Sequence, residues 1–505
     1  MKGRFNMSDK THKQNLIKAQ NAVIEKESFA QKGSYRQQYH FMALTGWIND
    51  PNGLIFWHGQ YHLFYQYNPY ASVWGSMHWG HAVSNDLINW EYLPIALAPS
   101  ETYDDNFHGG CFSGSAVSND DTLMLIYTAA TKCGDVLLQT QCLATSKDGI
   151  TFEKYENNPV IKELPPQASS DFRDPKVLKY KDTWYMVVGS SLGKGARLGG
   201  DGCAQMYKST DLINWEYCGV IAKSNGKLGT MWECPDLFPI GDKWVLMFSP
   251  MFYGKRKTVY LLGDMDFDNY SFSWDYEGEI DYGFEYYAPQ SFLDNKGRRI
   301  LIAWANGWEW MPWWKDFGPT ASEGWCGHFA IPREVRIAKD KGLQFVPINE
   351  LESLRTDCKS YPSFILGSEE KKEIHAGDGI HCELLINIDV GASTARQVIL
   401  DVRQGENERV RIVLSLKDKE VLFSRINSIG QVEELKQQIF ADFGKSLLTM
   451  HLFLDTCSVE LFVMDYKMSF SGNFYFNENS NLIFLESKCG YTKINSVHTY
   501  ALSIH

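Results

Sequence analysis

Residues 47–53 read Trp-Ile-Asn-Asp-Pro-Asn-Gly and place the carboxyl group of Asp50 among residues that favour turns. Pro51 fixes its own φ angle, and Gly53 admits backbone conformations that other residues rarely adopt, so the chain after Asp50 is constrained. Asparagine, proline and glycine form turns wherever they occur, and a single such stretch would indicate only a turn. This one indicates more, because related polar motifs recur along the chain.

Five segments share one pattern, in which a short polar motif is followed by a strand, a tight turn and a strongly apolar or aromatic strand. Such self-similarity at a nearly fixed period predicts a repeat architecture. A second motif, SNDLINWE at residues 84–91, recurs as STDLINWE at residues 209–216. The five polar motifs follow one another at intervals of about 54 to 63 residues: Asn49-Asp50-Pro51, Phe112-Ser113-Gly114-Ser115, Arg173-Asp174-Pro175, Glu233-Cys234-Pro235 and Tyr287-Ala288-Pro289-Gln290.

Each repeat holds several short strands with turn signals and no long helical pattern, which is typical of one four-stranded sheet. The sequence therefore predicts an all-β chain that begins with a five-bladed β-propeller. If each polar motif begins the innermost strand of its blade in the same register, Asp50, Asp174 and Glu233 meet at one end of the central channel. The alternative is that the three acids lie in turns at the blade edges with their carboxylates in water. The three acids occupy equivalent positions in separate repeats, which favours their convergence at the end of the channel.

The remaining chain suggests three further segments. Residues 1–34 are polar and rich in Lys, Gln and Glu, and they predict a helical extension before the propeller, which we place at residues 35–345. Residues 346–365 are expected to be a linker. Residues 366–505 alternate short apolar strands with turns, which predicts a β-sandwich. This second domain contains no acid pair or metal cluster suited to catalysis. We therefore expect it to pack against the propeller and stabilise it.

Composition excludes several classes of partner. The chain has 505 residues, 22% charged and 44% hydrophobic, which is typical of a globular protein. A net charge of −12 argues against nucleic acid or an anionic membrane as the main partner. Residues 1–34 contain no apolar run that resembles a signal peptide or a membrane span. Eleven scattered cysteines, without a zinc-like spacing, fit the reducing cytoplasm and indicate neither a metal nor another cofactor. The sequence does not indicate an oligomeric state.

Carboxyl groups that face each other across a pocket are the minimum equipment for glycoside hydrolysis. One carboxylate acts as nucleophile or base, while the other must hold a proton at neutral pH to protonate the departing oxygen. Burial and neighbouring negative charge raise the pKa of a carboxyl group, so three crowded acids permit this division of labour.

The four motifs that contain Asp50, Ser113, Asp174 and Glu233 resemble those of glycoside hydrolase family 32, the β-fructofuranosidases. The resemblance extends from about Tyr39 to the C-terminus. It implies a retaining mechanism with the Asp50 and Glu233 carboxyl groups about 5–5.5 Å apart. Asp50 would attack the anomeric carbon of the fructosyl unit through a covalent intermediate. Glu233 would act as acid and then as base.

The same resemblance implies that Asp174 holds fructose hydroxyls and stabilises the transition state with help from Arg173, although an ordinary Arg-Asp ion pair is the alternative. Ser113 and Gln66 would exchange hydrogen bonds with hydroxyls, and tryptophans would cover apolar sugar faces. Core packing is the alternative for each tryptophan, a backbone hydrogen bond is the alternative for Gln66, and Cys234 needs no chemical role. The expected pocket residues are Asn49, Gln66, Trp74, Phe112, Ser113, Arg173, Tyr287 and Trp304.

Residues 304–314 contain five tryptophans, followed by Lys315. This segment would form an aromatic platform at the channel rim, or alternatively a hydrophobic lid or a subunit contact. Lys315 is a candidate for binding the phosphate of a phosphorylated substrate. The resemblance implies sucrose or sucrose 6-phosphate as substrate, with fructan hydrolysis or fructosyl transfer as alternatives. The non-enzymatic alternative is a propeller that binds sugars without cleaving them.

Overall fold

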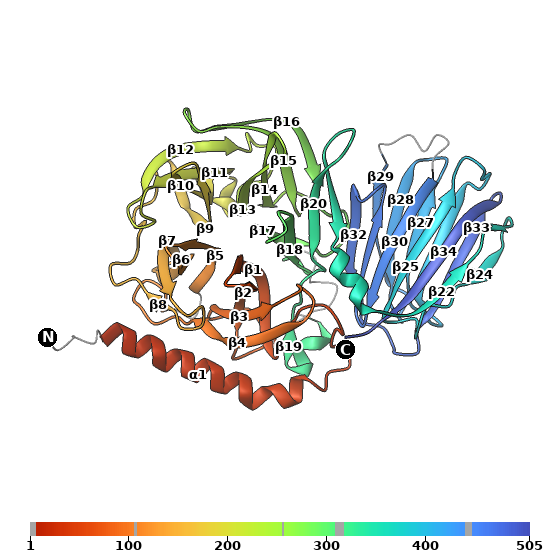
Figure 1. The fold of residues 1–505 in the computed structure, drawn as a ribbon, viewed down its shortest axis with the longest axis horizontal. Coiled ribbons are helices and arrows are strands. Elements are labelled where there is room, and N and C mark those ends of the chain that lie inside the picture. The colour runs from red at the N-terminus through yellow and green to blue at the C-terminus, as the bar shows by residue number, and fades with distance from the viewer. Residues whose placement is uncertain (1–6, 106–108, 255–256, 309–317, 440–446, 505) are drawn as a thin grey trace. The chain divides into compact units, whose positions relative to one another are not determined.

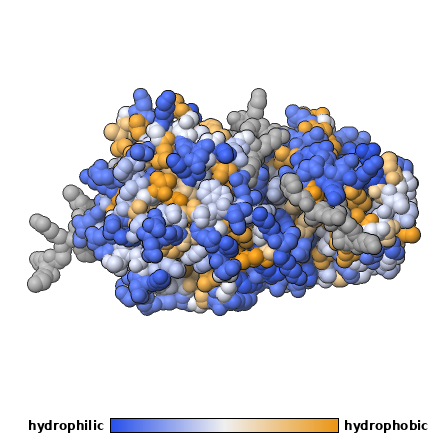
Figure 2. All heavy atoms as spheres, turned by 90° about the horizontal axis from the view of Figure 1, so that it is seen from above, coloured by the Kyte–Doolittle hydropathy of each residue, from blue (hydrophilic) through white to orange (hydrophobic). Residues whose placement is uncertain are grey.

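A computed structural model describes residues 7–105, 109–254, 257–308, 318–439 and 447–504. Strands dominate it, which confirms the prediction of a nearly all-β chain (Figure 1). The chain divides into two compact units. Unit 1 comprises residues 1–33, 41–279 and 287–343, and unit 2 comprises residues 34–40, 280–286 and 344–505. Hydrophilic residues predominate on the face in Figure 2, where hydrophobic residues occur in small scattered groups.

Unit 1 contains five antiparallel sheets that follow one another along the chain. The first consists of β1 (Gly46–Trp57), β2 (Gln60–Asn68), β3 (His78–Ser84) and β4 (Trp90–Leu97), and the second of β5 (Gly110–Asn119), β6 (Thr122–Cys133), β7 (Val136–Ser146) and β8 (Glu153–Lys154). The third consists of β9 (Ala168–Tyr180), β10 (Thr183–Leu192), β11 (Asp201–Ser209) and β12 (Glu216–Lys223), and the fourth of β13 (Met231–Ile240), β14 (Lys243–Met251), β15 (Val259–Asp266) and β16 (Ser271–Glu279). The fifth consists of β17 (Tyr287–Leu293), β18 (Arg299–Trp304), β20 (Arg333–Ile337) and β21 (Leu343–Pro347).

The repeated motif SNDLINWE forms the turn between the last two strands of a sheet. Asp86 Oδ1 accepts hydrogen bonds from the backbone N–H groups of Ile88 and Asn89, at 2.9 and 2.8 Å. Asp211 Oδ1 makes the same two bonds in the third sheet, to Ile213 and Asn214, also at 2.9 and 2.8 Å. The sequence echo is therefore a structural turn that holds the outer hairpin of its sheet, because the aspartate side chain satisfies backbone donors that the ladder leaves free.

The first strands of the five sheets lie beside one another. β1 contacts β5 and β17, while β9 contacts β5 and β13, and β13 also contacts β17 (Figure 1). Apolar side chains fill the space between consecutive sheets. Examples are Trp79 and Tyr127 between the first two sheets, and Trp232 and Phe248 in the core of the third and fourth. This packing brings the polar motifs of sequence-distant strands into one region.

A short strand after the fifth repeat joins the first sheet. β19 (Trp325–Cys326) pairs with β1 in parallel, with Gly46 opposite Trp325. The chain then returns to the fifth sheet, where Arg333 of β20 lies opposite Leu301 of β18. Helix α1 (Met7–Ala30) also belongs to unit 1 and packs against β4. Asn15 Nδ2 donates to the carbonyl of Pro99 at 2.7 Å. Among the described residues, no helix has the length and apolar character needed to cross a bilayer.

Unit 2 is built on two larger sheets. One contains, in spatial order, β22 (Arg355–Tyr361), β34 (Thr492–Leu502), β25 (Cys382–Asp389), β30 (Leu447–Asp455), β31 (Ser458–Val463) and β32 (Met468–Asn473), with β23 (Phe364–Leu366) also paired to β34. The other contains β24 (Lys371–Glu373), β33 (Leu482–Lys488), β26 (Gln397–Gln404), β27 (Arg409–Ser415), β28 (Glu420–Ile426) and β29 (Val432–Gln438). Residues 346–365, which we expected to be a linker, thus include two strands paired with β34.

Two short segments from earlier in the chain complete unit 2. In the first, the backbone N–H groups of Gln38 and Tyr39 donate to the carboxylate of Asp455, at 2.8 and 3.0 Å. In the second, Asp281 accepts from the backbone N–H of Ser471 at 2.9 Å and from its hydroxyl at 2.8 Å. Each segment is held by a buried carboxylate that accepts backbone donors, and such bonds are among the stronger ones in proteins.

Candidate active site

A β-bulge lies at the polar motif in the first strand of every sheet in unit 1. In β9, Arg173 pairs with Gly189 and Lys176 with Val187, so two residues of β9 stand opposite one residue of β10. The other bulges lie between Ile48 and Pro51, Cys111 and Gly114, Glu233 and Asp236, and Tyr287 and Gln290. Bulges redirect side chains and frequently occur beside active sites. The repeated motif therefore encodes a repeated break in strand pairing.

The bulges correct one detail of our sequence interpretation. Four of the five motifs lie within their first strands, and only the motif at Tyr287 begins its strand. The three acids also do not share one register. Glu233 immediately precedes its bulge, Asp174 is the first residue of its bulge, and Asp50 is the second. In a regular strand a one-residue offset would send the side chain to the opposite face. The bulge removes this strict alternation.

The bulges also carry unusual backbone angles, which neighbouring sheets support. Asp174, Cys234 and Ala288 have φ angles of 65°, 48° and 51°. The N–H of Asp174 donates to Thr128 Oγ1 at 2.9 Å, and that of Ala288 donates to Ser249 Oγ at 3.0 Å. The N–H of Cys234 donates to Asp174 Oδ2 at 2.9 Å. These hydrogen bonds stabilise a conformation that L-residues otherwise avoid, as is common at functional sites.

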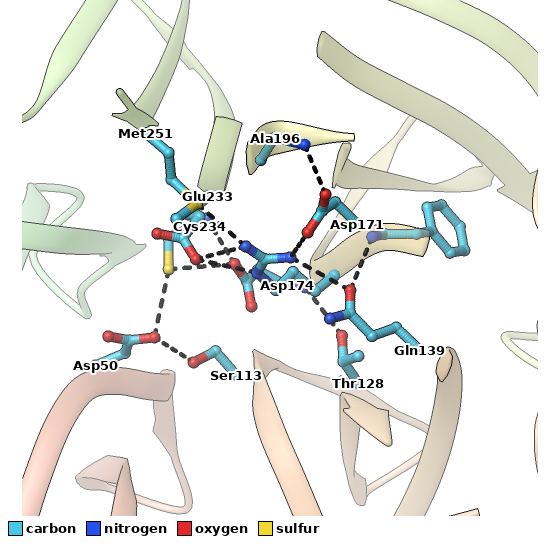
Figure 3. Close-up of polar contacts among 12 residues, drawn as sticks. Asp50, Ser113, Thr128, Gln139, Asp171, Asp174, Ala196, Glu233, Cys234 and Met251 are labelled. Atoms are coloured by element: carbon cyan, nitrogen blue, oxygen red, sulfur yellow. Dashed lines mark hydrogen bonds and ion pairs between the residues drawn. The ribbon is translucent and has the colours of Figure 1, made fainter. Parts of the chain in front are cut away.

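The three acids line one cavity of about 820 Å³. They come from the first, third and fourth sheets, and Figure 3 shows Asp50, Asp174 and Glu233 together around Cys234. A cavity of this volume accommodates a disaccharide-sized ligand. Of the eleven residues that we predicted for the site, ten line the cavity: Asn49, Asp50, Gln66, Trp74, Phe112, Ser113, Arg173, Asp174, Glu233 and Tyr287.

Asp50 accepts hydrogen bonds on both carboxylate oxygens. Ser113 Oγ donates to Oδ2 at 2.5 Å, and Asn49 Nδ2 donates to Oδ1 at 3.0 Å. Burial raises the pKa of Asp50 to about 6, and the negative charge of Glu233 adds to this rise, although the hydrogen bonds from Ser113 and Asn49 oppose it. Asp50 is therefore mainly ionised at neutral pH and has a fixed orientation.

Asp174 is buried, and burial raises its pKa to about 7. The neighbouring Arg173 guanidinium opposes this rise, while the charges of Glu233 and Asp50 add to it. Its Oδ2 atom also lies 3.6 Å from the Cys234 thiol, which in turn lies 3.5 Å from Asp50 Oδ2. Burial raises the pKa of Cys234, so the thiol is neutral and serves as a weak donor between two carboxylates. Our sequence interpretation gave this cysteine no role.

Glu233 is held by two residues from different sheets. Arg173 donates to Glu233 Oε1 from Nε at 3.0 Å and from Nη2 at 2.8 Å. Tyr287 OH donates to the other oxygen, Oε2, at 2.5 Å. Arg173 therefore forms ion pairs with Glu233 and Asp171, and no ion pair joins it to its neighbour Asp174 among the residues that the structure describes.

Comparisons with known proteins identify the family. Residues 40–347 match the description "Glycosyl hydrolases family 32 N-terminal domain", and residues 350–501 match "Glycosyl hydrolases family 32 C terminal". The chain belongs to glycoside hydrolase family 32. This finding confirms the resemblance seen in the sequence motifs and makes the chain a glycoside hydrolase.

Similar proteins cover nearly the whole family 32 chain. The sucrose-6-phosphate hydrolase of Zymomonas mobilis is 36% identical over 469 residues, which are 89% of this chain and 88% of that protein. The raffinose invertase of Escherichia coli is 35% identical over 500 residues, with coverages of 95% and 97%. A solved structure of a variant of the Bombyx mori GH32 β-fructofuranosidase BmSUC1 in complex with sucrose is 33% identical, has a TM-score of 0.78 and covers 96% of this chain and 97% of that one.

The other predicted pocket residues of this family 32 chain have contacts of three kinds. Asn49 accepts from Trp47 Nε1 at 2.8 Å and so presents its amide to Asp50. Gln66 Nε2 donates to the carbonyl of Cys111 at 2.8 Å, a backbone hydrogen bond of the kind that we considered as its alternative. The rings of Trp74 and Phe112 meet edge to face, with centroids 6.1 Å apart. Both rings line the cavity.

Trp304 is the one predicted residue that does not line the cavity. It is fully buried, and its ring contacts those of Trp47 and Trp308 with centroids 5.6 and 5.0 Å apart. Core packing, our alternative for the tryptophans, therefore describes Trp304, whereas Trp308 lines the cavity. The rest of the predicted aromatic platform, with Trp310, Trp313, Trp314 and Lys315, lies outside the described residues.

Several cavity residues were missed by sequence reasoning, namely Asp135, Val136, Gln139, Asp171, Lys194, Arg197, Leu198, Met251 and Phe252. Asp171 Oδ1 accepts from Arg173 Nη1 at 3.1 Å, and Gln139 Oε1 accepts from the same atom at 3.4 Å. Asp171 lies two residues before Arg173, so both side chains lie on the same side of β9. This spacing is the sequence signal that could have identified Asp171 as a site residue. Lys194 and Arg197 lie outside any motif. Among the described residues, no group of His, Cys, Asp and Glu is arranged to hold a metal ion.

Proposed function

We propose that this protein hydrolyses terminal β-D-fructofuranosides, with sucrose or sucrose 6-phosphate as substrate, through a covalent fructosyl-enzyme intermediate. The observation that carries the proposal is the convergence of three carboxyl groups from three sheets in one cavity, each with different partners. The relatives named above add support, because their names or bound ligand concern sucrose, sucrose 6-phosphate or raffinose.

Asp50 is the nucleophile. Its pKa of about 6 leaves it mainly ionised at neutral pH, and its half-buried position limits its solvation. A carboxylate oxygen of Asp50 forms a bond to the anomeric carbon of the fructosyl unit as the bond from that carbon to the bridging oxygen breaks. The electron pair of the broken bond stays on the leaving sugar.

Glu233 supplies the proton that the departing oxygen takes up, and it then removes a proton from the water that attacks the intermediate. Arg173 and Tyr287 fix both of its carboxyl oxygens and so aim the group across the cavity. Two carboxyl groups with these successive roles are the standard requirement of a retaining glycosidase. The separation of about 5–5.5 Å that such a mechanism needs between Asp50 and Glu233 remains a prediction.

Asp174 binds fructose hydroxyls and stabilises the positive charge that develops on the ring. Its left-handed backbone and its bond from the Cys234 N–H fix the carboxylate beside the other two acids. An ionised carboxylate placed beside a developing oxocarbenium ion lowers the barrier by electrostatic stabilisation. Asn49, Ser113, Trp74 and Phe112 form the surrounding fructose pocket.

The proposal extends to architecture and compartment. We infer that the five sheets of unit 1 close into a five-bladed propeller, supported by the contact of β17 with β1 and by the parallel pairing of β19 with β1. The two larger sheets of unit 2 are proposed to form a β-sandwich from about residue 350. All eleven cysteines are free thiols, which supports the reducing cytoplasm as the compartment.

Incubation of the purified protein with sucrose, sucrose 6-phosphate and maltose tests the activity. We expect free fructose from at least one of the first two and no cleavage of maltose, which has no fructosyl unit. Rapid NMR should detect the β anomer of fructose first, because two inversions at the anomeric carbon restore its configuration. Binding of fructosides without cleavage of any would favour a sugar-binding propeller and contradict the proposal.

A further inference from the structure

The segment between β10 and β11 forms one wall of the cavity. It contains a 3₁₀ turn at Ala196–Leu198, and Lys194, Gly195, Ala196, Arg197 and Leu198 all line the cavity. Gly195 has a φ angle of 86°, and a Cβ atom at this position would lie 3.1 Å from Asp171 Oδ2. The φ angle favours glycine here, and a larger residue would also crowd the Asp171 carboxylate.

Asp171 ties this wall to the side of the cavity where Glu233 lies. Its Oδ2 atom accepts from the N–H of Ala196 at 2.8 Å, and its Oδ1 atom accepts from Arg173 Nη1 at 3.1 Å. Arg173 in turn contacts Glu233. Figure 3 shows the bond between Ala196 and Asp171 on the same side of the site as Glu233. Since Glu233 protonates the leaving sugar in the proposed reaction, this wall borders the space that the leaving sugar occupies.

The wall carries two cations. Lys194 and Arg197 are both exposed, and neither has an ion pair with any residue that the structure describes. Arg173, by contrast, is buried and already bonded to Asp171 and Glu233. Asp171 contacts this wall, and Asp135, an exposed residue of the turn between β6 and β7, also lines the cavity. Because the Asp171 carboxylate is already paired with Arg173, the two exposed cations leave this part of the cavity suited to an anion.

We infer that Lys194 and Arg197 bind the phosphate of a phosphorylated leaving sugar, so that the enzyme prefers sucrose 6-phosphate to sucrose. Arginine and lysine make charge-assisted hydrogen bonds to phosphate oxygens, and arginine can do so through two parallel bonds. Leu198 and Phe252, both exposed at the cavity, offer apolar contact to the glucose ring. The inference rests on the proposed function and adds to it the residues that select the substrate.

The test compares kcat/KM for sucrose 6-phosphate and for sucrose in the wild-type enzyme, in the double variant Lys194→Gln/Arg197→Gln and in a control. We expect the wild type to favour the phosphorylated substrate, and the double variant to lower the ratio of the two kcat/KM values by about 10- to 100-fold. Lys227→Gln removes an exposed positive charge outside the cavity and should leave the ratio within about twofold. Inhibition by glucose 6-phosphate should weaken in the double variant, whereas inhibition by glucose should change less.

The outcomes separate this inference from the proposed function. A wild type that cleaves sucrose but shows no preference for sucrose 6-phosphate, or a double variant with an unchanged ratio, would overturn the inference and leave the hydrolase intact. Failure of the wild type to cleave any fructoside would overturn both. A ratio that falls equally in Lys227→Gln would mean that net charge, and not this wall, attracts the phosphate, which would also contradict the inference.

Discussion

Buried carboxylates in the two units have opposite electrostatic surroundings. In unit 2, Asp455 is fully buried and accepts from the N–H groups of Gln38, Tyr39 and His40, and its Oδ2 atom lies 2.8 Å from His40 Nδ1. The hydrogen bond and charge of His40 hold the pKa of Asp455 below its usual value, despite burial. In unit 1, burial dominates and raises the pKa of Asp50 and Asp174 to about 6 and about 7.

The difference separates a carboxylate that stabilises a fold from one that performs chemistry. His40 lies between Asp455 and Glu460, and its bonds to these acids raise its pKa to about 9, so at neutral pH His40 is a cation between these two acids. In the cavity, Arg173 forms ion pairs with Asp171 and Glu233, whereas neither Asp50 nor Asp174 forms an ion pair with any residue that the structure describes, so the charge of these two acids is only partly compensated. Under-compensated charge costs stability, but it is available to act on a substrate.

The largest expected effect is on turnover. Asp50→Asn and Glu233→Gln keep the shape of each side chain but remove the nucleophile or the acid, so each should lower kcat by about 10,000-fold or more. Fructose release from sucrose or sucrose 6-phosphate measures this effect. Asp121→Asn is the matched control, because the Asp121 side chain is 79% exposed and lies outside the cavity. An Asp50→Asn enzyme with activity near that of Asp121→Asn would show that this carboxylate is not the nucleophile.

The next largest effect concerns the structural acid. Asp455→Asn leaves His40 and three backbone donors with a weaker acceptor in a buried site, and it should lower the free energy of unfolding by about 3–5 kcal/mol. Urea denaturation followed by tryptophan fluorescence measures the change. Asp418, which pairs with Arg396 at an exposed position of the same unit, provides the control. Asp418→Asn should change the free energy of unfolding by less than about 1 kcal/mol. An equally small change for Asp455→Asn would show that Asp455 does not stabilise the fold.

An opposite change in stability is expected at the cavity. A carboxyl group whose pKa rises on folding adds stability below its unfolded pKa, and this contribution is lost as the pH rises through the folded value. For Asp50 the pH window runs from 3.8 to about 6. Asp50→Asn should therefore stabilise the protein at pH 8 by about 1–3 kcal/mol, allowing for the partial exposure of the group, and should have little effect near pH 3.5. Calorimetry at both pH values tests this, and a destabilised variant at pH 8 would contradict it.

The sequence predicted the acids of the cavity in unit 1, but it did not predict the structural acid Asp455 in unit 2. Each catalytic candidate stands in a motif that repeats, so Asp50, Asp174 and Glu233 could be found without coordinates. Their offset registers could not, because a bulge is a backbone feature that turn-forming residues permit but do not specify. Trp304 ends the apolar run Ile300–Trp304, and burial follows from that pattern better than a place in the pocket does.

The hydrogen bonds to Arg173 and the contact of His40 with Asp455 in unit 2 could not be predicted from the sequence, for a different reason. Asp171 and Gln139 are ordinary polar residues of strands, and only the fold brings them to the arginine. His40 and Asp455 are 415 residues apart, and neither belongs to a motif. A single sequence contains no signal for a contact of that separation, so the grouping of residues 34–40 and 280–286 with unit 2 could not be predicted.

A smaller effect is expected in the pH dependence of kcat/KM, which reports the ionisation of the cavity acids. Because the proposed reaction needs both Asp174 and Asp50 ionised, kcat/KM should begin to fall below about pH 7 and should fall more steeply, by up to about a hundredfold per unit, below about pH 6. Steady-state kinetics between pH 4 and pH 9 at constant ionic strength measures this limb. If kcat/KM stayed constant down to pH 4, the cavity would compensate Asp50 as fully as unit 2 compensates Asp455.

The smallest expected effect comes from Cys234, whose thiol lies within 3.6 Å of both Asp50 and Asp174. A donor to a carboxylate stabilises the charged form, so Cys234→Ala should raise the pKa of Asp50 and move the acid limb upward by less than about one pH unit. Cys234→Ser keeps a donor and should move the limb less. Both variants carry the same Cβ at a φ angle of 48°, so backbone strain is matched between them and the cysteine. Identical profiles for the two variants would mean that Cys234 only fills space, and that hydrogen bonds from Ser113 and Asn49 alone oppose the effect of burial on Asp50.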